Sequence, residues 1–166
     1  KFQQCEDLSA RRALSLALLR RSQEAFATLV AEIMDEYDAY TFLSLERGSK
    51  KYLPLRPIIL GGDDITFVCA AQVALRYTTR LIKLLAAPNA AEPAGLKQGM
   101  DCCAGIAILP TSYPFFRGYE LAEQLCGAAK IEMRKRLAAD GSGGSSWIDF
   151  AILHGEQPPE LMQLRE

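Results

Sequence analysis

The stretch of sequence that decides the fold is Pro57-Ile58-Ile59-Leu60-Gly61-Gly62-Asp63-Asp64-Ile65-Thr66-Phe67-Val68-Cys69. Residues 57–60 and 65–69 are short runs rich in β-branched and aromatic side chains, which favour strands. The connection between them consists of two glycines and two aspartates, which are typical turn residues. The sequence therefore predicts a β-hairpin whose four-residue connection, residues 61–64, forms the tip.

Downstream of this hairpin, helices alternate with strands. Apolar residues at helical spacing predict a helix over residues 74–85, which ends before Pro88. Residues 102–109 are nearly all apolar and predict a central strand, after which Pro114 opens a long amphipathic helix. Residues 147–153 predict a last strand. The predicted order after the hairpin is therefore helix, strand, helix, strand.

Upstream of the hairpin, the chain is predicted to be helical. Apolar residues between Leu14 and Ile33 follow a helical spacing, and either Asp7 or Ser9 suits the N-cap. One long helix over residues 8–37 and a kinked pair of helices both fit this pattern. Residues 40–55 mix apolar and polar side chains and predict a loop.

These elements predict a single α+β domain over residues 1–166, with helices on one face of an antiparallel-rich sheet. A four-stranded ferredoxin-like sheet needs one more strand, immediately before the first helix. We expect this strand to be missing from the chain and to lie upstream of Lys1.

Composition excludes several classes of function. The 19 basic and 20 acidic residues give a formal net charge of −1, which argues against a protein coated in positive charge for duplex DNA. No apolar run approaches the roughly 18 residues of a membrane span, so no membrane partner is expected. Five cysteines without a C-x-x-C pair and a single histidine, His154, do not supply a zinc site. A soluble, reduced, cytoplasmic protein is predicted.

The predicted hairpin tip carries the residues with chemical potential. Asp63 and Asp64 are adjacent carboxylates, which repel each other unless a cation or a proton lies between them. Mg²⁺ or Mn²⁺ suits such a pair, because hard cations take carboxylate oxygens together with substrate phosphates. Gly61 and Gly62 have no Cβ, so a nucleotide can approach the backbone closely. The same residue types occur in plain hairpin turns, but two carboxylates between two apolar strands favour metal-assisted phosphoryl or nucleotidyl transfer.

Residues 57–68 resemble the palm-domain hairpin of the large polymerase/cyclase subunit of type III CRISPR effector complexes, a palm related to that of GGDEF diguanylate cyclases. Later blocks are similar to the central strand and the following helix of the same family. These blocks are residues 104–108, 113–115, 119–123 and 128–130. The resemblance covers nearly the whole chain, and its hairpin motif is the more specific part.

The resemblance implies a ferredoxin-like palm that binds an ATP-like nucleoside triphosphate and forms phosphodiester bonds by two-metal catalysis, often giving cyclic oligoadenylate in antiviral defence. Asp63 and Asp64 match the catalytic and metal-binding positions. Gly61 and Gly62 match the positions on which the nucleotide lies. Lys130 matches a helix lysine that contacts the triphosphate, although a solvated lysine on a helix is an equally good interpretation.

The resemblance also implies partners. In this family two palms face each other with nucleotide between them, so a second palm is expected, in a homodimer or from another subunit, with RNA reached through a larger complex. Family palms carry a further metal-binding Asp at the end of the first strand, which this chain is expected to lack. The alternative function is therefore a catalytically inactive palm that serves as a nucleotide-binding or assembly module.

Overall fold

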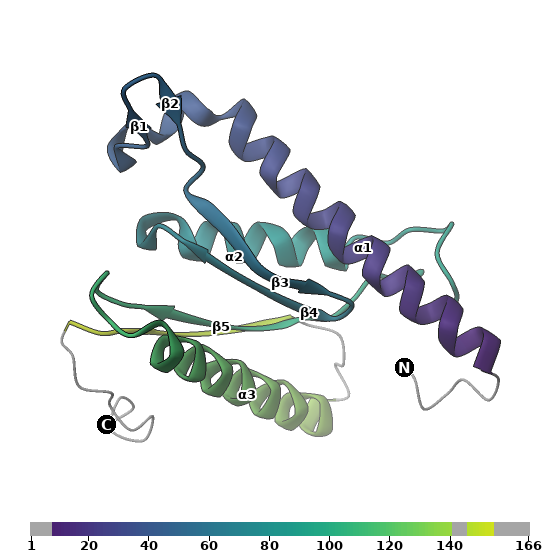
Figure 1. Cartoon of the computed structure of the whole chain (residues 1–166). Coiled ribbons are helices and arrows are strands. Elements are labelled where there is room, and N and C mark those ends of the chain that lie inside the picture. Colours follow the sequence, from purple (N-terminus) through teal and green to yellow (C-terminus); the bar gives the residue numbers. More distant parts are fainter. Residues whose placement is uncertain (1–7, 141–145, 155–166) are drawn as a thin grey trace. The chain divides into compact units, whose positions relative to one another are not determined.

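The computed structural model describes residues 8–140 and 146–154, which form an α+β fold, as predicted. The chain divides into two compact units, Lys1–Met100 and Asp101–Glu166, and each is described here by itself. The prediction of a single domain over residues 1–166 stays a prediction. The elements follow in the order α1 (Leu8–Asp35), the 3-10 helix η2 (Tyr37–Leu43), β1 (Glu46–Arg47), β2 (Lys50–Lys51), β3 (Leu55–Gly61), β4 (Asp64–Cys69), α2 (Ala71–Ala86), β5 (Cys103–Ile108), α3 (Phe115–Asp140) and β6 (Trp147–Ile152) (Figure 1).

Helix α1 is the longest element of the first unit. Of the two alternatives left by the sequence, the structure has one helix of 28 residues. Ser9 is its second residue, and Asp7, the other N-cap candidate, lies outside the described residues. The buried stripe of α1 packs against α2 and β3, and the Phe26 ring lies 6.0 Å from the ring of Phe67 on β4. The helix therefore forms one wall of the core beneath the hairpin.

Strands β3 and β4 form the predicted antiparallel hairpin, but its loop is shorter than predicted. Gly61 and Asp64 already pair with each other, so the loop consists of Gly62 and Asp63 alone rather than of four residues. The register shifts between Pro57 and Ile59, next to a proline that has no N–H to donate to the ladder. Because Gly61 and Asp64 are paired, both strands extend further toward the tip than the apolar runs indicated.

The segment between α1 and the hairpin is not the plain loop that the sequence predicted. It contains the 3-10 helix η2 and a small antiparallel pair, β1–β2, in which Glu46 pairs with Lys51. The Tyr40 ring of η2 meets the Tyr77 ring of α2 edge-on, at 6.1 Å between centroids. This burial of an aromatic ring holds the segment in place, a contact that no local sequence pattern indicates.

In the second unit, β5 and β6 pair in parallel, with Cys103 opposite Trp147 and Ile108 opposite Ile152. Helix α3 connects them and packs on one face of the pair, as a crossover between parallel strands requires. Strand β5 was predicted to be central, yet among the described strands it pairs with β6 alone. The described residues begin with α1, so the strand expected before this helix lies outside them. None of the described helices is long and apolar enough to cross a membrane.

Candidate functional site

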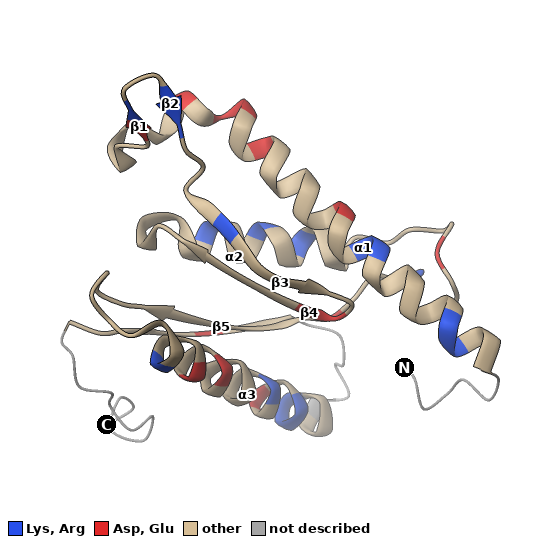
Figure 2. Ribbon diagram, viewed as in Figure 1, with Lys and Arg blue, Asp and Glu red and all other residues tan. Residues whose placement is uncertain are grey.

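The tip of the β3–β4 hairpin is a two-residue turn that requires glycine at its first position. Gly62 has φ +62°, whereas Asp63 is not among the residues with positive φ. This combination is the pattern of a type II′ turn, whose twist matches that of the flanking strands. Asp63 and Asp64 are both exposed at this tip, where Figure 2 shows the acidic residues of the hairpin.

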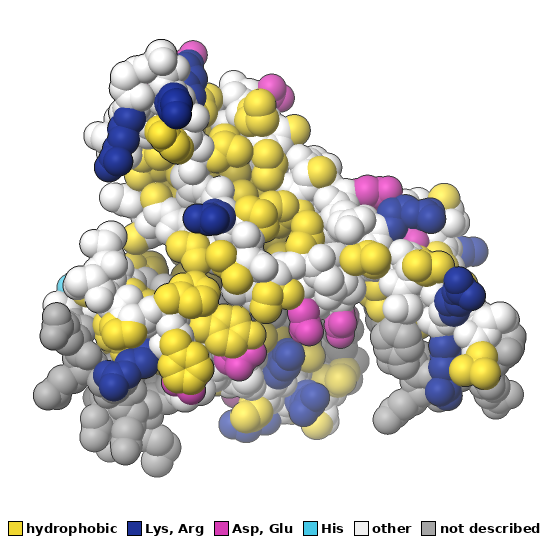
Figure 3. All heavy atoms as spheres, viewed as in Figure 1, with side chains coloured by type: hydrophobic (Ala, Val, Ile, Leu, Met, Phe, Trp, Pro, Cys, Tyr) yellow, Lys and Arg dark blue, Asp and Glu magenta, His cyan; other side chains and the backbone are white. Residues whose placement is uncertain are grey.

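The hairpin has one face toward α1 and one face away from it. Phe67 points toward Phe26 of α1, so Asp64 and Val68 lie on the opposite face because side chains alternate along a strand. Gly61 and Ile59 share that face, since they lie in the same register as Asp64 and Thr66. Ile59 and Val68 are 39% and 46% exposed. The far face therefore presents apolar side chains next to a carboxylate, and Figure 3 shows acidic side chains at the surface beside hydrophobic ones in this region.

The two glycines leave open space around the carboxylates. A Cβ added to Gly61 or to Gly62 would meet no other atom within 4 Å. Gly61 is the cross-strand partner of Asp64, so no partner side chain stands next to the Asp64 carboxylate on this face of the hairpin. A ligand bound by Asp63 and Asp64 could therefore lie against the hairpin backbone.

A buried serine of α1, which the sequence analysis did not single out, contacts this turn. Ser22 is 0% exposed, and its hydroxyl donates a hydrogen bond of 2.5 Å to the carbonyl oxygen of Gly62. The only sequence signal for this residue is a serine that continues the apolar spacing of Leu14, Leu18 and Phe26. Such a pattern indicates a buried polar side chain, but it does not indicate the partner 40 residues away.

The structure brings together four of the five predicted site residues. Gly61, Gly62, Asp63 and Asp64 form the turn and its first pair, whereas Lys130 is exposed on α3 in the second unit. No group of three or more potential metal-ligating side chains occurs among the residues that the structure describes. What this part of the chain offers a cation is therefore a pair of carboxylates.

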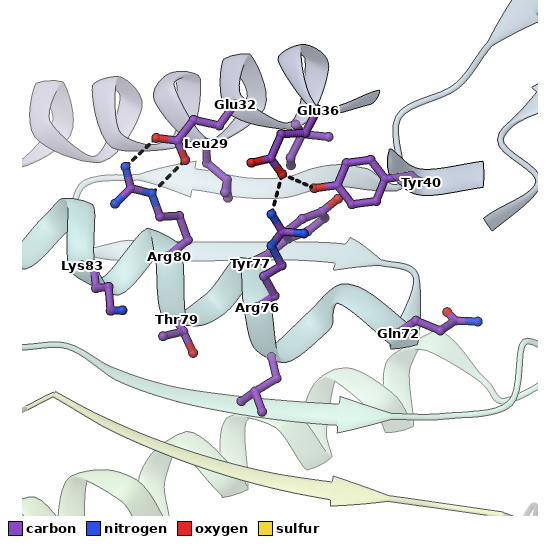
Figure 4. A pocket seen from close by; sticks show the side chains of 12 residues that line it. Leu29, Glu32, Glu36, Tyr40, Gln72, Arg76, Tyr77, Thr79, Arg80 and Lys83 are labelled. Carbon is purple, nitrogen blue, oxygen red and sulfur yellow. Dashed lines mark hydrogen bonds and ion pairs between the residues drawn. The ribbon is translucent and has the colours of Figure 1, made fainter. Parts of the chain in front are cut away.

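A cavity of the first unit lies elsewhere, between α1 and α2. It measures about 610 Å³, and Figure 4 shows its charged side chains reaching across from one helix to the other. Arg80 binds the carboxylate of Glu32 through Nε at 2.8 Å, and Arg76 pairs with Glu36. The hydrogen bonds from Arg80 lower the pKa of Glu32. Because these charges satisfy one another across the two helices, we assign them a structural role.

Two of the described cysteines, Cys69 and Cys103, have partly buried thiols. Burial raises the pKa of Cys69 to about 11, and burial also raises the pKa of Cys103. Thiols with such pKa values stay protonated at neutral pH, which makes them poor nucleophiles and poor metal ligands.

Comparison of the chain with protein-family models, with curated proteins and with solved structures finds no match in any of the three.

Proposed function

We propose that this chain is a palm-type nucleotidyltransferase or nucleotide cyclase, which forms phosphodiester bonds from an ATP-like nucleoside triphosphate. The observation that carries the proposal is the pair of exposed carboxylates, Asp63 and Asp64, at the tip of a turn whose glycines leave the approach open. Plain solubility of a hairpin turn does not require two adjacent like charges.

The residues of the hairpin fit a divalent cation that carries a nucleotide. Asp63 and Asp64 would hold Mg²⁺ or Mn²⁺, which usually binds one or two protein carboxylates and completes its coordination with phosphate oxygens and water. When bound, such ions would neutralise phosphate charge and make the attacking hydroxyl more acidic. The exposed side chains of Ile59 and Val68 offer an apolar surface on which a base can lie.

Removal of the carboxylates tests the proposal directly. In the Asp63→Ala/Asp64→Ala variant we expect Mn²⁺ affinity, measured by electron paramagnetic resonance, to fall at least tenfold, because the only paired carboxylates of the turn are gone. The free energy of unfolding should change by less than about 0.5 kcal/mol, since both side chains are exposed. An unchanged Mn²⁺ affinity in the folded variant would refute the proposed site.

Gly61→Ala is the matched variant that separates metal binding from nucleotide binding. Its new methyl group meets no protein atom within 4 Å and lies on the same face as Asp64. We therefore expect unchanged stability and unchanged Mn²⁺ affinity. Affinity for ATP with Mg²⁺, measured by calorimetric titration, should fall about tenfold because the methyl group occupies the space beside the carboxylate. Unchanged ATP affinity would place the nucleotide away from Gly61.

The proposal includes a second palm as a partner, from another copy of the chain or from another subunit. An isologous pair places both hairpins near a two-fold axis, with nucleotide between them. Since nucleotide would then bind the dimer better than the monomer, ATP with Mg²⁺ should tighten dimerisation through linkage. Sedimentation velocity should show a concentration-dependent dimer that ATP and Mg²⁺ favour. A monomer at high concentration in both conditions would rule out the homodimer.

One observation favours the alternative function, an inactive palm that binds nucleotide or supports assembly of a larger complex. The described residues offer two carboxylates and no third metal ligand nearby. A chain of this kind would bind ATP with Mg²⁺ at the hairpin and form no product. Incubation with radiolabelled ATP and Mn²⁺, followed by chromatography of the products, distinguishes the two functions.

A further inference from the structure

A side-chain hydrogen bond ties the turn that carries Asp63 to α1. Ser22 is fully buried, and its hydroxyl donates to the Gly62 carbonyl at 2.5 Å. A buried hydroxyl without a partner costs about 1–3 kcal/mol, so this bond has a strong preference to form. Ser22 lies between Leu18 and Phe26 on the buried stripe of α1, and both of these side chains are core residues. The packing of α1 in the core therefore holds the Ser22 hydroxyl in place.

This bond determines which way the central peptide of the turn faces. The Gly62–Asp63 peptide is trans and planar, so its C=O and its N–H point in opposite directions. With the carbonyl held toward α1, the Asp63 N–H must point away from the helix. Type I′ and type II′ turns place different signs of φ at the second loop residue, so the orientation of this peptide also sets the direction in which the Asp63 side chain leaves the backbone.

We propose that Ser22 is a positioning residue for the hairpin site: by holding the Gly62 carbonyl toward α1, it keeps the turn in one form and thereby fixes the direction in which Asp63 presents its carboxylate to a divalent cation shared with Asp64. This inference rests on the proposed function. Gly62 is partly exposed, so without the hydroxyl its carbonyl can bond to water instead, and the peptide is free to rotate. The two carboxylates then share a cation only in part of the population.

The test compares Ser22→Ala with a control on the same helix. Alanine is the best helix former and is smaller than serine, so the variant is expected to fold. We expect its Mn²⁺ affinity, measured by electron paramagnetic resonance on the full chain, to fall about tenfold. Ala25→Gly is the matched control, because Ala25 is also buried on α1 and has no hydroxyl that could bond to the turn. A glycine there costs about 1 kcal/mol of helix stability and should leave Mn²⁺ affinity unchanged.

A nuclear magnetic resonance measurement on the same samples separates positioning from a structural role. In Ser22→Ala the Gly62 and Asp63 amide resonances should shift or broaden as the peptide reorients, and Ala25→Gly should leave them in place. If Asp63→Asn abolishes Mn²⁺ binding while Ser22→Ala binds as the wild type does, the inference is wrong and the proposed function stands. If Asp63→Asn binds Mn²⁺ as the wild type does, the proposed function itself fails. If in addition the Asp63 amide resonance is unchanged in Ser22→Ala, the positioning role of Ser22 is overturned as well.

Discussion

Replacing Gly105 with alanine is expected to destabilise the second unit by about 3 kcal/mol, near the upper end of the usual cost of overpacking a core. A Cβ at this position of β5 would overlap the backbone oxygen of Ala122 and the backbone nitrogen of Cys126, and it would lie 2.9 Å from Cβ of Leu125. Neither backbone can rotate away as a flexible side chain could. The strand must therefore separate from α3.

Urea denaturation of the full chain measures this effect, because Trp147, the one tryptophan, lies on β6 beside β5 and reports on this unit. The matched control is Gly127→Ala. Gly127 lies inside α3, and an added Cβ meets nothing within 4 Å. This control should raise stability by about 1 kcal/mol, since glycine is a poor helix former. A Gly105→Ala midpoint equal to that of the wild type would contradict the close packing of β5 on α3.

Replacing Arg21 with alanine is expected to cost about 3 kcal/mol in the first unit. The Arg21 side chain is only 7% exposed. Its Nε and one of its terminal nitrogens donate hydrogen bonds to the Leu85 carbonyl at 3.0 and 2.8 Å. The same terminal nitrogen also donates to the Ala87 carbonyl. The second terminal nitrogen lies 3.8 Å from the Glu92 carboxylate. A cation at this place also interacts favourably with the C-terminal end of α2.

Loss of the guanidinium leaves buried carbonyl groups without this donor and Glu92 without its cation. Amide hydrogen exchange of α2, with urea denaturation followed by circular dichroism, should show the loss. Arg20→Ala is the control, because Arg20 is the neighbouring residue of α1 and is exposed. It should change stability by less than about 0.5 kcal/mol. Equal effects of the two substitutions would show that Arg21 does not hold the end of α2.

The hairpin shows which features of this fold can be predicted from the sequence. Its strands, its turn residues and its two carboxylates were all predicted, because strand propensity and turn chemistry are local properties of residues 57–69. The length of the loop was predicted wrongly. Glycine and aspartate signal a turn, but whether Gly61 and Asp64 belong to the loop or to the ladder depends on cross-strand pairing.

The sequence by itself determined the kinds and order of the elements after residue 55, since apolar periodicity reports directly on which face of a helix or strand is buried. Only the tertiary structure decided the hydrogen-bond partners of Ser22 and Arg21. Both are polar residues on the buried stripe of α1, and their partners, Gly62 and Leu85, lie 40 and 64 residues further along the chain. A buried polar group must find a partner, but its identity depends on which elements the packing brings together, and no local pattern contains that information.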